Sequence, residues 1–175
     1  MKKIVTVFAL LLLAFSQTNC ERDDICSGTT PTTPRIVIDF YDYNQPTVLK
    51  NVTNLELQSI DSDSSVVVNG ESQLLLPLKT FEDSVTFNLT LNSLSTDPTL
   101  IFTDKIQFNY ARRDVYVSRA CGYKTLFTLN NDPALAPGYL LNDAPAETQG
   151  TWIRNIVVDT YNIDSEDETH IRIYF

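Results

Sequence analysis

A period-two alternation of apolar and polar side chains constrains the fold of this chain more than any other feature. In the segment 84–92, every second residue from Val85 to Leu91 is apolar, and threonine or asparagine lies between them. This period is typical of a β-strand with one buried face and one solvated face. No window after the N-terminal leader keeps an apolar stripe at helical spacing over the length of a stable helix. The sequence therefore predicts an all-β fold.

Similar patterns elsewhere bring the expected number of strands to about 8–10, which indicates an antiparallel β-sandwich of the immunoglobulin-like or a similar type. Asn69-Gly70 separates two short apolar runs, and this spacing predicts a hairpin with a tight turn. The other strands are expected at 35–43, 54–60, 66–68, 73–78, 104–111, 115–117, 123–129, 152–161 and 169–175.

The segment 130–150 is the one long stretch without a strand pattern. Pro133, Pro137 and Pro145 exclude a long helix or a central strand there. A loop of this length is often functional, so a binding role is one interpretation. The other is a crossover connection that covers an open end of the sandwich, with one helical turn near Ala134.

The N-terminus has the pattern of an export signal. Lys2 and Lys3 precede an unbroken apolar run, Ile4 to Leu13, which is shorter than the roughly 20 residues of a transmembrane helix. We interpret residues 1–19 as a signal peptide.

Two cleavage sites are consistent with this signal. Cleavage before Cys20 would make the protein a bacterial lipoprotein with an acylated cysteine, and Glu21 to Asp24 then resembles the acid-rich stretch that directs some lipoproteins to the cell surface. Cleavage after Ser16 would release a secreted protein. The lipoprotein interpretation divides the mature chain into a lipid-anchored acidic and Thr/Pro-rich tether at 20–34 and a β-sandwich domain at 35–175.

The three cysteines fit the same scheme. An exported protein with three cysteines has one odd thiol, and lipidation of Cys20 would account for it. Cys26 and Cys121 then remain to form a disulfide in an oxidising compartment. The alternative is that both are buried free thiols.

Charge narrows the set of partners. The whole chain carries a net charge of −9, which becomes −11 once Lys2 and Lys3 leave with the leader. Nucleic acid is therefore an unfavourable partner, because its affinity comes mainly from phosphate neutralisation.

One basic and aromatic cluster is a candidate binding patch for a carbohydrate or an anion. Such residues on a strand also commonly cover its solvated face and pair with acids on neighbouring strands, which is the alternative interpretation. The cluster consists of Arg112, Arg113, Tyr116, Arg119 and Tyr123.

Motifs for catalysis or cofactor binding are not found, so we expect a protein that is not an enzyme and has no cofactor or metal. His170 is the only histidine, and we expect it to begin the last strand after an acidic turn. The acidic run Asp61 to Ser65 lacks the glycine and glutamate of a calcium-binding loop, and it predicts a polar turn between strands.

Four stretches together resemble a family of uncharacterised gram-negative envelope lipoproteins. The resemblance implies an envelope lipoprotein with a β domain, and it carries over no catalytic residue. The stretches are Cys20-Glu-Arg-Asp-Asp-Ile-Cys26, the strand from Pro34 to Asp42, the Ser-Arg-Ala-Cys-Gly-Tyr core of Tyr110 to Phe127, and His170-Ile-Arg-Ile-Tyr-Phe175.

These observations predict a lipid-anchored binding or scaffolding module of the bacterial outer membrane, exposed at the surface or facing the periplasm. Its expected partners are the membrane, through the anchor, and another envelope protein or a glycan. The alternatives are a small outer-membrane β-barrel, because the chain ends in Phe175 after alternating apolar residues, or a secreted ligand- or glycan-binding domain.

Overall fold

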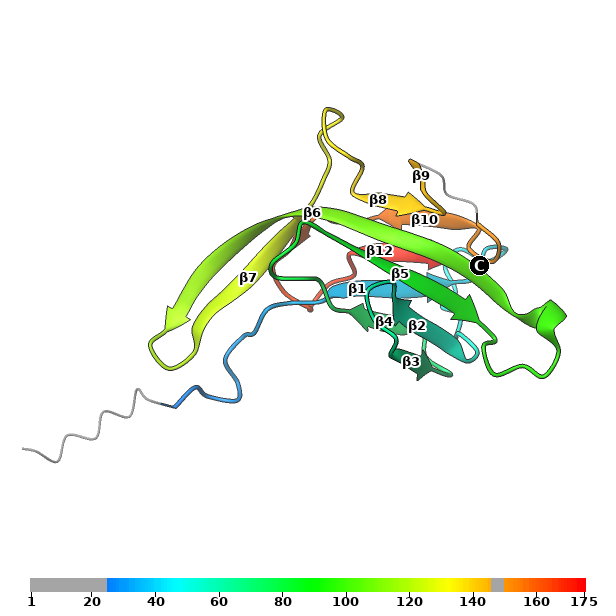
Figure 1. Cartoon of the computed structure of the whole chain (residues 1–175), viewed down its shortest axis with the longest axis horizontal. Helices are drawn as coiled ribbons and strands as arrows, with labels where there is room; N and C mark the ends of the chain where they lie inside the picture. Colours follow the sequence, from blue (N-terminus) through cyan, green and yellow to red (C-terminus); the bar gives the residue numbers. More distant parts are fainter. Residues whose placement is uncertain (1–24, 146–149) are drawn as a thin grey trace, which may run out of the picture. The chain divides into compact units, whose positions relative to one another are not determined.

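The computed structural model describes residues 25–145 and 150–175, and it confirms the all-β prediction (Figure 1). These residues contain twelve strands and one short 3-10 helix, η2 (Pro98–Leu100). None of the helices in this part of the chain has the length and hydropathy needed to cross a membrane. The strands are β1 (Ile36–Tyr41), β2 (Leu55–Ser59), β3 (Ser65–Val68), β4 (Gln73–Leu76), β5 (Ser84–Leu91), β6 (Phe102–Ser118), β7 (Gly122–Leu129), β8 (Tyr139–Leu141), β9 (Ala144–Pro145), β10 (Asn155–Val158), β11 (Asn162–Ile163) and β12 (Ile171–Tyr174).

The chain forms two compact units, which are described separately. The sandwich unit comprises residues 31–115 and 124–175. The disulfide unit comprises, in the described part of the chain, residues 25–30 and 116–123. The strands β6 and β7 have residues in both units.

Two sheets enclose the core of the sandwich unit. One is four-stranded with the order β10-β12-β1-β4, and the other is eight-stranded with the main path β11-β7-β6-β5-β2-β3 and the short strands β8 and β9 beside β6. Alternating residues of β5 and β6, such as Val85, Phe87, Ile106 and Phe108, join one buried cluster with residues of the other sheet, such as Ile38. The predicted β-sandwich is thus confirmed.

One strand pair departs from the antiparallel prediction. β1 and β12 pair in parallel, with Ile38 opposite Ile171 and Phe40 opposite Ile173. Parallel neighbours need a long crossover connection, and here the connection is the rest of the domain, since these are the first and last strands.

The hairpin predicted at Asn69-Gly70 is wrong. β3 pairs with β2, whereas β4 pairs with β1 in the other sheet, so this turn connects the two sheets. Gly70 still has the positive φ of 76° that such a turn uses. The apolar run after Gly70 does not return along β3, because β4 buries Leu74 and Leu76 against β1. The turn of the hairpin formed by β2 and β3 is instead the polar run Asp61 to Ser64.

Strand lengths also differ from the prediction. The segments 104–111 and 115–117 belong to one 17-residue strand, β6. The segment 130–150 contains β8, which pairs with β6 and buries Leu141, and β9, which pairs with β8. The predicted strand 152–161 is shorter, and β11 follows it.

A buried carboxylate fixes the chain before β10. Asp104 lies on the core face of β6, and its Oδ1 accepts hydrogen bonds from the Thr151 N–H (2.6 Å) and the Asn142 side-chain amide (2.9 Å). Its Oδ2 accepts from the Trp152 and Ile153 N–H groups at 2.9 and 3.0 Å. Burial alone would raise the pKa of Asp104, but these four hydrogen bonds outweigh it and lower the pKa below the usual range. The carboxylate is therefore charged and saturated with donors.

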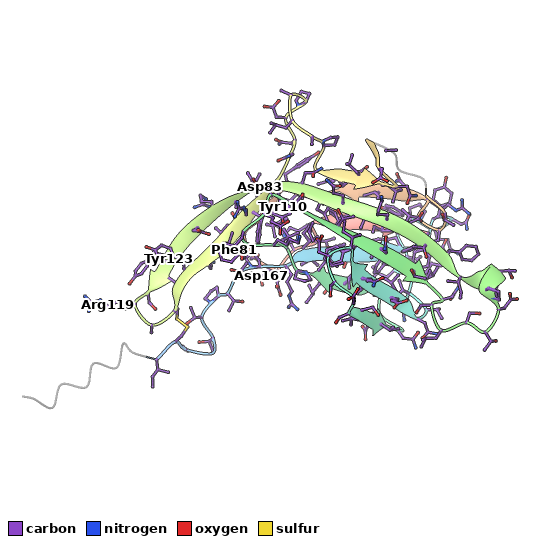
Figure 2. The ribbon with its side chains drawn as sticks, in the orientation of Figure 1. Phe81, Asp83, Tyr110, Arg119, Tyr123 and Asp167 are labelled. Atoms are coloured by element: carbon purple, nitrogen blue, oxygen red, sulfur yellow. A yellow bond between two sulfur atoms is a disulfide. The ribbon has the colours of Figure 1, made fainter. Side chains whose placement is uncertain are left out.

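Tyr110 makes a second internal anchor. Its buried hydroxyl accepts a hydrogen bond from the Lys79 N–H at 2.9 Å and donates one to the Lys79 carbonyl at 3.2 Å, which holds the connection between β4 and β5. Its backbone N–H also donates to the Asp83 carbonyl, and Figure 2 shows both residues near the start of β5.

We expect Tyr110→Phe to lower the free energy of unfolding by about 1–2 kcal/mol, because it leaves the Lys79 amide groups without their partner. Urea unfolding followed by circular dichroism measures this. Tyr43→Phe, at a 47% exposed side chain, is the matched control and should change stability by less than about 0.5 kcal/mol. Equal stability of the two variants would contradict the anchoring role.

Candidate ligand pocket

The five residues of the predicted basic and aromatic patch divide between the two units. Arg112 and Arg113 are exposed residues of the sandwich unit. The Arg112 guanidinium donates to the Asp83 carboxylate at 2.7 Å and to the Thr80 carbonyl at 2.6 Å. Arg112 therefore joins β6 to the β4–β5 connection, as the alternative interpretation of the patch proposed.

Tyr116, Arg119 and Tyr123 belong to the disulfide unit. The rings of Tyr116 and Tyr123 meet edge to face with centroids 5.4 Å apart, and both side chains are exposed. Figure 2 shows the side chains of Arg119 and Tyr123 extending away from the ribbon. The disulfide that the sequence predicts, Cys26–Cys121, lies in the same unit. A shallow hollow of about 450 Å³ beside it is lined in part by Tyr116 and Arg119.

A second pocket lies in the sandwich unit at the segment from Asn130 to Tyr139, within the long irregular stretch singled out in the sequence. We call it the loop pocket. It has a volume of about 450 Å³ and a mixed lining of aromatic, aliphatic and polar side chains. The lining includes Asn131, Asp132, Leu135, Val158 and Tyr161.

The base of the loop pocket is held by backbone contacts. The Asn109 side-chain amide donates to the Pro137 carbonyl at 2.7 Å, and the Asn109 N–H donates to the Gly138 carbonyl at 3.0 Å. A Cβ at Gly138 would lie only 2.6 Å from the Asn130 carbonyl oxygen, so only glycine allows this close approach. Pro133 and Pro137 limit the backbone further, and the pocket is therefore preformed.

Two kinds of chemistry meet in the loop pocket. Tyr161, 39% exposed, and Leu135 offer apolar contact surface. Asp132 uses Oδ1 to accept from the Ala134 N–H, which leaves Oδ2 for a ligand. Within residues 25–145 and 150–175, the side chains of Asn131 and Tyr161 have no hydrogen-bond partner. Such a lining suits a neutral ligand with hydroxyl groups and an apolar face.

Sequence reasoning singled out the segment that supplies eight of the ten lining residues of this pocket. It singled out 130–150 from its prolines, but Val158 is the last residue of β10 and Tyr161 comes just before β11. The pairing of β11 with β7, together with the hydrogen bond from the Leu129 N–H to the Tyr161 carbonyl, brings Tyr161 to the loop. No local sequence pattern predicts that Tyr161 lies beside the 130–139 segment.

His170 was expected to begin the last strand; it lies one residue before β12, and it is fully buried. Its Nδ1 accepts a hydrogen bond from the Val37 N–H at 2.9 Å, and its Nε2 has no partner in the described part of the chain. Glu166 in the acidic turn pairs instead with Arg35, at 2.7 Å. Burial lowers the pKa of His170, against the opposite effect of the carboxylates of Glu168, Glu166 and Asp164.

Stability should therefore decrease as the pH falls below about 6.5, the pKa of an unfolded-state histidine. Below that pH the unfolded chain binds a proton that the folded chain does not, so the free energy of unfolding falls by up to about 1.4 kcal/mol per pH unit until the folded-state pKa is reached. The measurement is urea unfolding between about pH 7.5 and pH 5.5. His170→Asn, whose side-chain oxygen can replace Nδ1 as the acceptor, should flatten this slope. If the free energy of unfolding of His170→Asn falls with pH as steeply as that of the wild type, titratable groups other than His170 cause the pH dependence.

Asp61 to Ser64 lie where the sequence placed a polar turn, between β2 and β3, and Ser65 begins β3. The Asp61 carboxylate pairs with Lys79 at 2.6 Å. Among residues 25–145 and 150–175, no group of three or more histidine, cysteine, aspartate or glutamate side chains is arranged to hold a metal ion.

These features define a two-sheet β-sandwich with a disulfide and a preformed loop pocket. The chain belongs to a family of unknown function, DUF6452, whose model matches residues 54–175. This result agrees with the resemblance to an uncharacterised family. No curated protein and no solved structure matches the chain significantly.

Proposed function

We propose that the protein is a lipid-anchored envelope protein of a gram-negative bacterium and that its β-sandwich is a binding module. The loop pocket carries the binding role, because it combines a rigid base with unpaired polar groups and aromatic surface. The signal peptide at 1–19 and the lipidation site at Cys20 lie outside the described residues, so the anchor rests on the sequence. The Cys26–Cys121 disulfide supports export, since such bonds persist mainly in oxidising compartments.

The ligand class that best fits the loop pocket is a neutral glycan. The apolar face of a sugar ring can pack on Tyr161, and its hydroxyl groups can pair with Asn131 and Asp132. Among the described residues, no lysine or arginine lines the pocket, which disfavours acidic sugars and phosphorylated ligands.

The test is binding of the purified protein to an array of neutral and acidic glycans. We expect binding to neutral glycans, and Tyr161→Ala should weaken it about tenfold or more because it removes the stacking surface. The matched control is Tyr43→Ala, a similarly exposed tyrosine outside the pocket lining. Binding to no neutral glycan, or an equal loss in both variants, would contradict the proposal.

The anchor is tested separately by Cys20→Ser. We expect the wild-type protein to fractionate with membranes and the variant to appear in the soluble fraction, because the variant cannot be acylated. Membrane retention of the variant at an unchanged processed size would exclude lipidation at Cys20.

A scaffolding role is the second candidate, and one observation favours it. Val66 and Val67 on β3 are exposed, and β3 is the edge strand of the larger sheet. An exposed edge strand can add a strand from an envelope partner. Specific pull-down by the wild type, abolished by Val66→Lys, would support this role over glycan binding.

A further inference from the structure

We propose that the disulfide unit lies in the headgroup region of the membrane, with Tyr116 and Tyr123 inserted at the lipid–water interface. This inference rests on the lipid anchor at Cys20 proposed above and specifies a second contact between the protein and the lipid surface. The occupant of this surface is lipid. The loop pocket takes no part in it.

The first argument is the length of the tether. Cys26 follows Cys20 by six residues, and a fully extended chain advances at most about 3.3–3.6 Å per residue. Cys26 therefore lies within about 20 Å of the acylated cysteine. The disulfide transfers this restraint to Cys121, in the turn between β6 and β7. The ends of both strands in this unit are thus held close to the lipid surface.

The second argument is the chemistry exposed there. The exposed fractions are 84% for Ile25, 54% for Tyr116 and 70% for Tyr123. Isolated exposed apolar residues need no explanation, but here three large side chains occur in one small unit. Tyrosine is enriched at membrane interfaces because its ring is apolar and its hydroxyl stays hydrated.

The third argument is that the unit is ordered before it meets lipid. The two tyrosine rings already pack edge to face at 5.4 Å. The turn between them is held by the hydrogen bond from the Cys121 N–H to the Ser118 hydroxyl at 3.0 Å, and Gly122 has the positive φ of 70° that the turn requires. Insertion of the pair therefore orders few additional groups.

Charge indicates which lipid surface suits the unit. Glu21, Asp23 and Asp24 outnumber Arg22 in the tether between the anchor and the disulfide, so an anionic surface would repel this segment. Within 25–30 and 116–123, the described part of the unit, Arg119 is the exposed cation. Association driven by the tyrosine rings should therefore occur on zwitterionic phosphatidylcholine and should depend little on salt.

The test uses the full lipidated protein in phosphatidylcholine vesicles that contain brominated acyl chains. Tyr123→Trp provides the reporter, and the spectrum of the wild type is subtracted, because the chain's own tryptophan, Trp152, is buried. We expect bromines placed near the headgroups to quench most of the reporter emission, and bromines near the bilayer centre to quench much less. A Tyr116→Trp reporter should behave in the same way.

The matched control is a triple variant that combines Tyr123→Trp with Cys26→Ser and Cys121→Ser. It keeps Cys20 as the anchor and removes the disulfide. We expect this protein to remain on vesicles and to lose most of the quenching. A vesicle-bound protein whose reporter is not quenched would overturn the proposed contact, and quenching that persists without the disulfide would overturn the tether argument. Vesicle flotation measures separately whether the reporter protein stays bound to vesicles. A reporter protein that does not float with the vesicles would contradict the proposed lipid anchor at Cys20.

Discussion

Replacement of Asp104 by asparagine is expected to lower the free energy of unfolding by about 3 kcal/mol. The aspartate accepts four hydrogen bonds, and the amide group of asparagine would point a donor at N–H groups that need an acceptor. The segment from Thr151 to Ile153 would lose the group that fixes it to β6. Urea unfolding at neutral pH measures the effect, because the lowered pKa keeps the aspartate charged there.

Asp143→Asn is the matched control, since it makes the same isosteric change at an exposed carboxylate. Asp143 pairs with Lys105 at the surface, where such pairs contribute about 0–1 kcal/mol. Asparagine also tolerates the positive φ of 67° at this position. Similar destabilisation by the two substitutions would show that the buried hydrogen-bond network does not hold the segment.

Replacement of both Cys26 and Cys121 by serine is expected to lower the free energy of unfolding by about 4–5 kcal/mol in the chain-entropy model. The disulfide closes a loop across a sequence separation of 95, so its loss gives the unfolded chain many more conformations. Guanidinium unfolding of the variant against the wild type, both without reductant, measures the difference.

Reduction of the wild type provides the control, because it opens the same loop without a change in sequence. The reduced wild type and the double variant should unfold at the same denaturant concentration. A double variant as stable as the oxidised wild type would mean that the disulfide only tethers the N-terminal segment.

The β-sandwich was predictable because its strands expose one face to solvent. The alternation at 84–92 maps onto β5, where Val85, Phe87 and Leu89 are buried. The cysteine count led to the Cys26–Cys121 disulfide, and polar turns such as Asp61 to Ser64 fall where the sequence placed them.

Long-range pairing was not predictable from local patterns. Asn69-Gly70 has the composition of a hairpin turn, yet the burial of Leu74 and Leu76 against β1 decides where β4 pairs. The role of Asp104 was hidden for a similar reason, because four donors from distant positions keep this charged side chain inside the core. The parallel pairing of β1 with β12 likewise depends on the whole intervening chain.

The candidate sites show the same limit. The basic and aromatic patch was defined by closeness in sequence, but Arg112 is bound to Asp83 and Thr80. The loop pocket was indicated only through its prolines, since Tyr161 reaches it by the pairing of β11 with β7.

Intact mass spectrometry of the protein extracted from gram-negative membranes tests the central claim most directly. A lipid-anchored envelope protein should begin at Cys20, carry the mass of its acyl groups, and gain about 2 Da on reduction as the Cys26–Cys121 disulfide opens. A mature chain that begins at Gln17 without added lipid, or one that retains Met1, would contradict the claim.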